Sequence, residues 1–350
     1  MKGRSIAARV SQEFRWPLLA QAGLVALPCI GLSVILKEHV LLRVGLLGVV
    51  LLIPAARLQL HSVAIFCVFG LVLLGLLLIF AVFPNPKLFV IVSATLAGST
   101  MICTYFGADL RSLGVYCFIP ALYLGCELRQ EHAAMADLLR LGAWVGVAPV
   151  LVIIARSVSH YFEEQQVQGT GISHAANRFR WLSDRPGTYG SSNTHWCRDA
   201  LTMLGGVAAS ATVMIWGAFP HPEWGIWSAA SVVTSEASTT YAKLRGRGLG
   251  AVVGVTLGVI AAHWAPRGEA VALLATIGVM VSLVGMKTYA LSFGTRCFLI
   301  TVGAAATGAA YGTGVSRIEN VVIGAVIGSV AVSIPNWIRF ALDGNTQSAG

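Results

Sequence analysis

The sequence has little charge for its length. Only 11% of its 350 residues are Asp, Glu, Lys or Arg, whereas 56% are hydrophobic and the mean hydropathy is +0.75. Soluble globular domains carry a charge on about a quarter of their residues. This composition excludes an ordinary soluble domain and predicts an all-α polytopic membrane protein in contact with the lipid bilayer.

The sequence also lacks the short motifs of several functional classes. Its seven cysteines form no C-x-x-C pair and its eight histidines form no H-x-x-x-H pair, so neither a disulfide framework nor a metal site is indicated. There is no phosphate-binding G-x-x-x-x-G-K-[ST] loop and no G-x-S-x-G nucleophile elbow. We therefore expect no metal, no cofactor and no enzymatic activity.

Long apolar runs fill most of the chain. Because a membrane-spanning helix needs about 20 apolar residues, the runs predict about twelve transmembrane helices. The expected spans are 16–36, 40–60, 62–83, 88–108, 111–128, 137–157, 199–219, 224–242, 248–264, 269–286, 288–310 and 318–338.

The positions of the cationic residues predict an orientation. With both termini in the cytoplasm, 16 of the 24 Lys and Arg residues fall on the cytoplasmic side and 7 on the outer side. Such an excess is typical of cytoplasmic loops. The net charge of +9 is thus explained by topology, and a nucleic-acid partner is not expected.

The spans divide into two similar blocks around one polar stretch. We expect two six-helix halves in parallel orientation, because six crossings return each block to its starting side. The alternative is one bundle without internal symmetry. The expected parts are an N-terminal half at 1–158, a cytoplasmic linker at 159–197, a C-terminal half at 198–340 and a flexible tail at 341–350.

One stretch, residues 224–258, carries most of the unusual residues. Four serines spaced three or four apart share one helix face, and a carboxylate lies among them; these are Ser228, Ser231, Ser235, Ser238 and Glu236. A basic turn is expected next, at Lys243, Arg245 and Arg247. Four glycines then form a stripe that lets another helix approach closely, namely Gly246, Gly250, Gly254 and Gly258.

This stretch resembles the signature of the fusaric acid resistance and aromatic acid exporter family. The similarity lies in its W-x-x-W start (Trp224, Trp227) and its R-x-x-G-x-x-x-G core, which begins at Arg247. The segment from Arg317 to Gly324 is similar to the family's R-x-x-[DN]-x-x-x-G opening of a final helix. The likeness covers about 198–338, and the central cytoplasmic segment is shorter than in longer members.

The resemblance implies a function and a location. It implies an efflux transporter of the bacterial inner membrane for aromatic carboxylic acids or similar small organic anions. It also implies that the protein binds a periplasmic adaptor protein. The chain is further expected to be able to form a homo-oligomer. In the absence of a phosphate-binding loop, transport is expected to be driven by a gradient. An anion channel-like pore and a non-transporting scaffold of an envelope complex are the alternatives.

Two ionisable residues within expected spans are candidates for the transport chemistry. Arg296 either binds a substrate carboxylate through its planar guanidinium group, pairs with Glu236, or reaches toward the inner surface. Glu236 either couples transport to protons, since burial favours a protonated carboxyl group, or hydrogen-bonds to nearby hydroxyl groups.

The remaining candidates have weaker signals. Ser231, Ser235 and Ser238 either contact substrate or pack a neighbouring helix. Lys243, Arg245 and Arg247 are anchors on the cytoplasmic side, and Arg247, within the family-like motif, is also a substrate-binding candidate. Arg317 and Glu319 are expected at the outer start of a helix, where they either gate the path or cap the helix.

Overall fold

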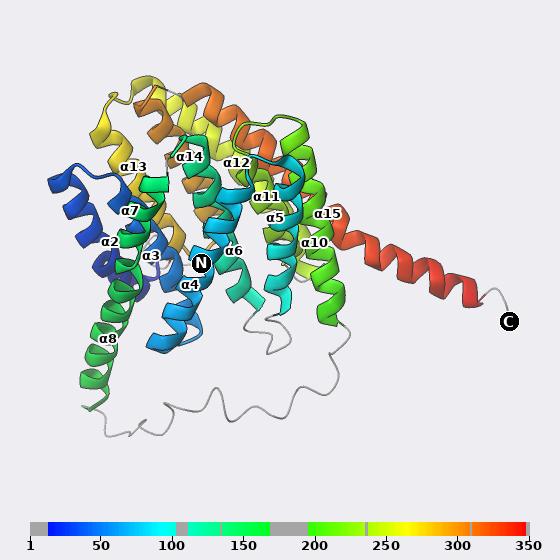
Figure 1. Cartoon of the computed structure of the whole chain (residues 1–350), viewed down its shortest axis with the longest axis horizontal. Coiled ribbons are helices and arrows are strands. Elements are labelled where there is room, and N and C mark those ends of the chain that lie inside the picture. The colour runs from blue at the N-terminus through cyan, green and yellow to red at the C-terminus, as the bar shows by residue number, and fades with distance from the viewer. Residues whose placement is uncertain are drawn as a thin grey trace, which may run out of the picture.

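The computed structural model describes residues 13–102, 111–133, 135–168, 195–234, 237–308 and 310–347. Within these ranges the chain is helical and contains no β-strand (Figure 1). The helices before residue 169 are α2 (Trp16–Leu36), α3 (Val40–Arg57), α4 (Ser62–Val82), α5 (Pro86–Thr100), α6 (Arg111–Gln130), α7 (Met135–Val145) and α8 (Val147–Gln168).

The helices after residue 194 form the second part of the structure. They are α10 (His195–Trp216), α11 (Pro222–Val233), α12 (Ala237–Trp264), α13 (Glu269–Gly285), α14 (Tyr289–Ala306) and α15 (Ala310–Gln347). The end of α15 runs away from the bundle, whereas the other helices of this group lie within it (Figure 1).

Eight helical segments of the described chain are long and apolar enough to cross a membrane. Large apolar side chains on several of them are exposed, among them Leu27, Ile35, Leu71 and Leu257. Water disfavours such a surface, while lipid accepts it. The expectation of a multi-pass membrane protein is therefore confirmed. The count of twelve spans stays a prediction, since α5 and α13 are apolar but shorter than the other spans.

The structure corrects two expected helix boundaries. No turn lies at Lys243, Arg245 and Arg247, because α12 continues through them from Ala237 to Trp264. The preceding helix, α11, instead ends earlier, at Val233. The expected span 137–157 is likewise divided at Gly146, between α7 and α8. The sequence suggested a turn at residues 243–247 because three basic residues interrupt the apolar run there, but the helix continues through them.

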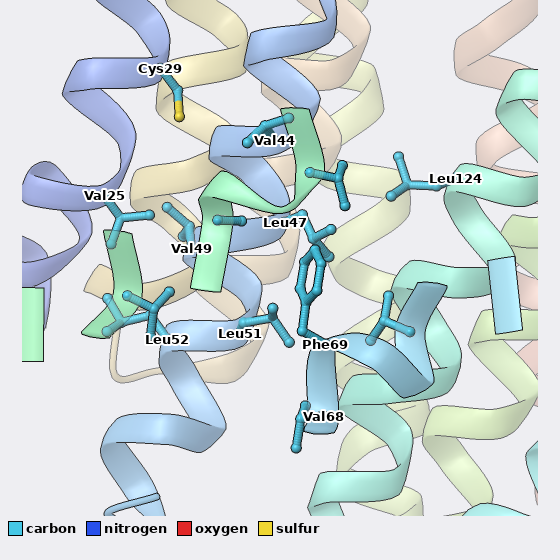
Figure 2. Packing of buried hydrophobic residues seen from close by; sticks show 14 of the residues in the cluster. Val25, Cys29, Val44, Leu47, Val49, Leu51, Leu52, Val68, Phe69 and Leu124 are labelled. Carbon is cyan, nitrogen blue, oxygen red and sulfur yellow. The ribbon is translucent and has the colours of Figure 1, made fainter. Parts of the chain in front are cut away.

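Buried apolar side chains hold the two groups of helices together. One cluster fills the space between α2, α3, α4, α6 and α8 (Figure 2). A second cluster joins α5 and α6 to α10 and α11, with Phe89, Met203 and Ile226 among its fully buried members. The helices before residue 169 and after residue 194 thus share a continuous apolar seam.

A second contact between the groups lies just before α2. The backbone N–H of Thr288 donates to Oε1 of Glu13 (2.7 Å), and the N–H of Arg15 donates to the carbonyl of Gly285 (2.8 Å). Hydrogen bonds from Thr288 also lower the pKa of Glu13. These bonds fasten the entry to α2 onto the connection between α13 and α14.

The glycine stripe of α12 faces α14. A Cβ atom on Gly250 would lie 3.2 Å from the backbone nitrogen of Gly294, and one on Gly258 would lie 2.8 Å from Cβ of Thr301. A Cβ atom on Gly254 would overlap the Gly294 carbonyl oxygen. Because these positions carry no side chain, the backbones of α12 and α14 come into direct contact.

A substitution within this stripe should separate the two helices. We expect Gly254→Leu to destabilise the protein by about 1–3 kcal/mol or more, because overpacking must push backbone away from backbone. Thermal unfolding of the purified protein in detergent measures the effect as a lowered midpoint. Gly248→Leu is the matched control, since nothing lies within 4 Å of a Cβ atom there. Equal midpoints for the two variants would contradict the tight contact.

Candidate functional site

The helix α11 is short and almost completely buried. Its 12 residues extend about 18 Å, less than the roughly 30 Å of a bilayer core. It lies among α6, α10 and α15. Against α15 the approach is very close, since a Cβ atom on Gly328 would lie 2.7 Å from the Ala229 carbonyl oxygen. This contact positions the side chains of α11 relative to those of α15.

Arg247 of α12 is held by aromatic side chains from two other helices. Its guanidinium carbon lies 4.9 Å from the ring centre of Phe293 and 5.9 Å from that of Trp227. Its Nε–H donates a hydrogen bond to the Tyr289 hydroxyl group (2.7 Å). The residue is only 3% exposed. Arg247 is therefore a cation packed inside the bundle and not a solvated anchor.

Arg317 of α15 is buried in a similar way. Its guanidinium carbon lies 4.7 Å from the ring centre of Trp224, and the residue is 3% exposed. Its Nε atom is buried without a hydrogen-bond partner. The arginines of the two family-like motifs thus each pack on one tryptophan of the W-x-x-W pair.

Arg296 completes a group of three arginines. Its Nε–H donates to the Ser292 carbonyl (3.3 Å), and its guanidinium carbon lies 5.5 Å from the centre of the same Phe293 ring that Arg247 covers. Arg317 lies on Trp224, three residues before the Trp227 ring that Arg247 contacts. We call Arg247, Arg296 and Arg317 the arginine cluster.

The arginine cluster has no acidic partner among the side chains that the structure describes. Removing a cation from water is costly, and aromatic faces return only about 0.5–2 kcal/mol for each contact. Arg247 and Arg296, which lie on the same Phe293 ring, also repel one another. A bound anion would relieve both costs, because guanidinium groups bind carboxylates through two parallel hydrogen bonds.

Several polar side chains, which the sequence analysis did not bring together, meet where α11 begins. Glu223 is 2% exposed at its side chain, accepts a hydrogen bond from Nε2 of Gln130 (3.0 Å) and lies 3.2 Å from Nδ1 of His221. Nδ2 of Asn320 donates to the carbonyls of Pro220 (2.5 Å) and His221 (3.0 Å). The only signal in the sequence was Asn320, which occupies the [DN] position of the final motif.

A hollow of about 360 Å³ opens beside this polar group. It is lined by Phe83, Gln130, Met214, Ile215 and residues 218–222. The arginine cluster does not line it. Trp224 connects the two places, because its ring stacks on His221 (4.3 Å between ring centres) and also lies under Arg317.

The other candidates have varied positions. Ser228 donates to the Val321 carbonyl (2.7 Å) and Ser231 to the Ser228 carbonyl (3.1 Å), so both hydroxyl groups contact backbone. Ser235 and Glu236 lie outside the described residues, as does the side chain of Ser238. An Arg296–Glu236 pair is therefore not among the described contacts.

The charged residues expected in the basic turn and at the start of the final helix have other positions in the structure. Arg245 and Glu319 are exposed. Arg317 and Glu319 lie about two turns after the start of α15 at Ala310, so neither caps that helix.

The long apolar helices describe a multi-pass membrane protein. Residues 198–331 match the family model described as fusaric acid resistance protein-like, and this range contains both family-like motifs. Comparisons with curated proteins and with solved structures gave no match.

Loss of the Asn320 amide should destabilise the segment that leads into α11, where Asn320 binds two backbone carbonyls. We expect Asn320→Leu to lower stability by about 1–3 kcal/mol, because two backbone carbonyls lose their donor inside the protein. The unfolding midpoint in detergent measures this loss. The neighbouring Glu319→Gln, at an exposed position, serves as control and should leave the midpoint unchanged; a fall of the same size there would contradict the assignment.

Proposed function

We propose that the arginine cluster is the substrate-binding site of an efflux transporter for small organic anions, chiefly aromatic carboxylic acids, in the bacterial inner membrane. One observation carries the proposal: Arg247 and Arg317 are buried against aromatic rings, Arg296 lies partly buried on the Phe293 ring that Arg247 also contacts, and none of the three has an acidic partner among the described residues.

The chemistry of the cluster suits an anion with a flat ring. Carboxylate oxygens would accept hydrogen bonds from the guanidinium groups. The substrate ring would pack against Trp224, Trp227 or Phe293, which already present their faces to cations. Because the site is shielded from water, each electrostatic contact is stronger than it would be at a surface.

The short helix α11 supports a transport path at this place. Helices that end within the membrane commonly form the central sites of secondary transporters. α11 ends at Val233, and α12 begins at Ala237. We further propose that a gradient drives export, that both termini are cytoplasmic, and that a periplasmic adaptor protein or a second copy of the chain completes the assembly.

Removal of Arg247 should strongly reduce transport. We expect Arg247→Gln to reduce uptake of a labelled hydroxybenzoate into inverted vesicles by roughly 10- to 100-fold, because charge-assisted hydrogen bonds contribute about 1.5–3 kcal/mol. Arg296→Gln should have a similar effect. Arg245→Gln is the matched control, two residues away on the same helix but exposed. Full transport by Arg247→Gln at normal protein level would refute the site. Anion current without proton dependence would instead indicate a channel.

Glu236 remains the proposed proton-coupling residue. We expect Glu236→Gln to transport at a rate that no longer responds to an imposed pH gradient, since an amide cannot take up the proton. The measurement is vesicle uptake with and without that gradient. Transport as fast and as pH-dependent as in the unchanged protein would exclude this role.

A further inference from the structure

The hollow beside His221 lies on the seam between the two groups of helices. Phe83 follows α4 and Gln130 ends α6, whereas Phe219 and His221 belong to the connection between α10 and α11. Its volume of about 360 Å³ lies within the roughly 300–1,000 Å³ of small-molecule sites. The phenylalanines supply apolar walls, and Gln130 and His221 supply polar groups.

The backbone holds His221 in this place at a cost. His221 has φ 56° and ψ 58°, a left-handed conformation that few residues other than glycine adopt. Asn320 fixes it by donating to the carbonyls of Pro220 and His221. Strain of this kind persists where the surrounding structure enforces it, and it is common at binding sites.

The His221 side chain has one nitrogen available to a ligand. Nδ1 lies 3.2 Å from Oε1 of the buried Glu223, while Nε2 makes no hydrogen bond to a described residue. The side chain is 38% exposed. Both carboxyl oxygens of Glu223 already have partners within the wall of the hollow, His221 and Gln130. A carboxylate in the hollow would meet an imidazole and an amide.

The hollow is connected to the arginine cluster by a single side chain. One ring, that of Trp224, stacks on His221 and also packs against Arg317. The indole of Trp224 thus separates Arg317 from His221 and is the one ring among the described side chains that contacts both.

From these contacts we infer that the hollow is the outer, release-side subsite of the anion path, with His221 as its polar contact and Phe83 and Phe219 as walls for an aromatic ring. The inference rests on the proposed function. The orientation expected from the Lys and Arg residues places the connection between α10 and α11 on the outer side. An aromatic carboxylate would occupy this subsite after it leaves the arginine cluster.

Protection of an introduced thiol tests the subsite. Ala218 lines the hollow, is exposed and already has a positive φ of 50°, so Ala218→Cys adds a sulfur atom without new strain. His132→Cys is a matched control, because His132 is also exposed with a positive φ of 56° but does not line the hollow. A membrane-impermeant thiol reagent is applied to the outer face, with the parent chain as baseline for its own cysteines.

We expect a saturating hydroxybenzoate to slow labelling of Ala218→Cys at least about threefold and to leave His132→Cys unchanged. His221→Asn, which tolerates the left-handed backbone, should raise the half-protecting concentration about 5- to 10-fold. Equal labelling of Ala218→Cys with and without the hydroxybenzoate would overturn the subsite. An unchanged half-protecting concentration in His221→Asn would overturn the role of the imidazole.

A combined variant separates occupancy of the hollow from effects of the arginine cluster. Protection of Ala218→Cys should persist when Arg247→Gln is added, since a local ligand does not need the inner site. Protection that disappears with Arg247 would overturn the subsite. The proposed function is tested separately by the vesicle experiments. It fails if the unchanged chain moves no hydroxybenzoate, or if Arg247→Gln transports fully, whatever the labelling shows.

Discussion

The cost of holding cations away from water is the constraint on which this structure depends. Arg247 and Arg317 are each 3% exposed, and each packs on a tryptophan of α11. Aromatic faces attract a guanidinium group but do not neutralise its charge. The protein therefore keeps a positive potential inside an apolar bundle, where few dipoles or ions weaken it. This potential makes the arginine cluster suited to an anion.

Close backbone contacts position those arginines. α12 touches α14 through Gly250 and Gly254, and α15 touches α11 where Gly324 meets the Gly225 carbonyl oxygen. A helix pair with larger side chains at these positions would be farther apart. The rings of Phe293 and Trp224 would then lie beyond the reach of the guanidinium groups. The glycines of both family-like motifs thus bring the helices close enough for the arginines of the same motifs to contact the aromatic rings.

Much of the candidate site was predictable because it lies within motifs. Arg296 stood out as a charge within an apolar segment, and Arg247 and Arg317 stood out through the family-like motifs, although they were expected in a basic turn and at a helix start. The glycine spacing indicated a helix contact. The side chains that each arginine contacts were not predictable. The roles of Trp224 and Trp227 as faces for two different arginines depend on helices that are far apart in the chain. The same is true of the Gln130–Glu223 contact, which joins residues 93 positions apart.

The sequence by itself determined the solvent and the helical class, because composition and the length of apolar runs reflect the energetics of lipid directly. It also identified the charged residues in and beside the apolar segments as candidate functional residues. Only the tertiary structure decided that α11 ends at Val233, that α12 passes through its basic residues, and that His221 lies between a hollow and the indole under Arg317. The physical reason is that these features arise from contacts between helices, whereas periodicity along one segment reports only which of its faces is apolar.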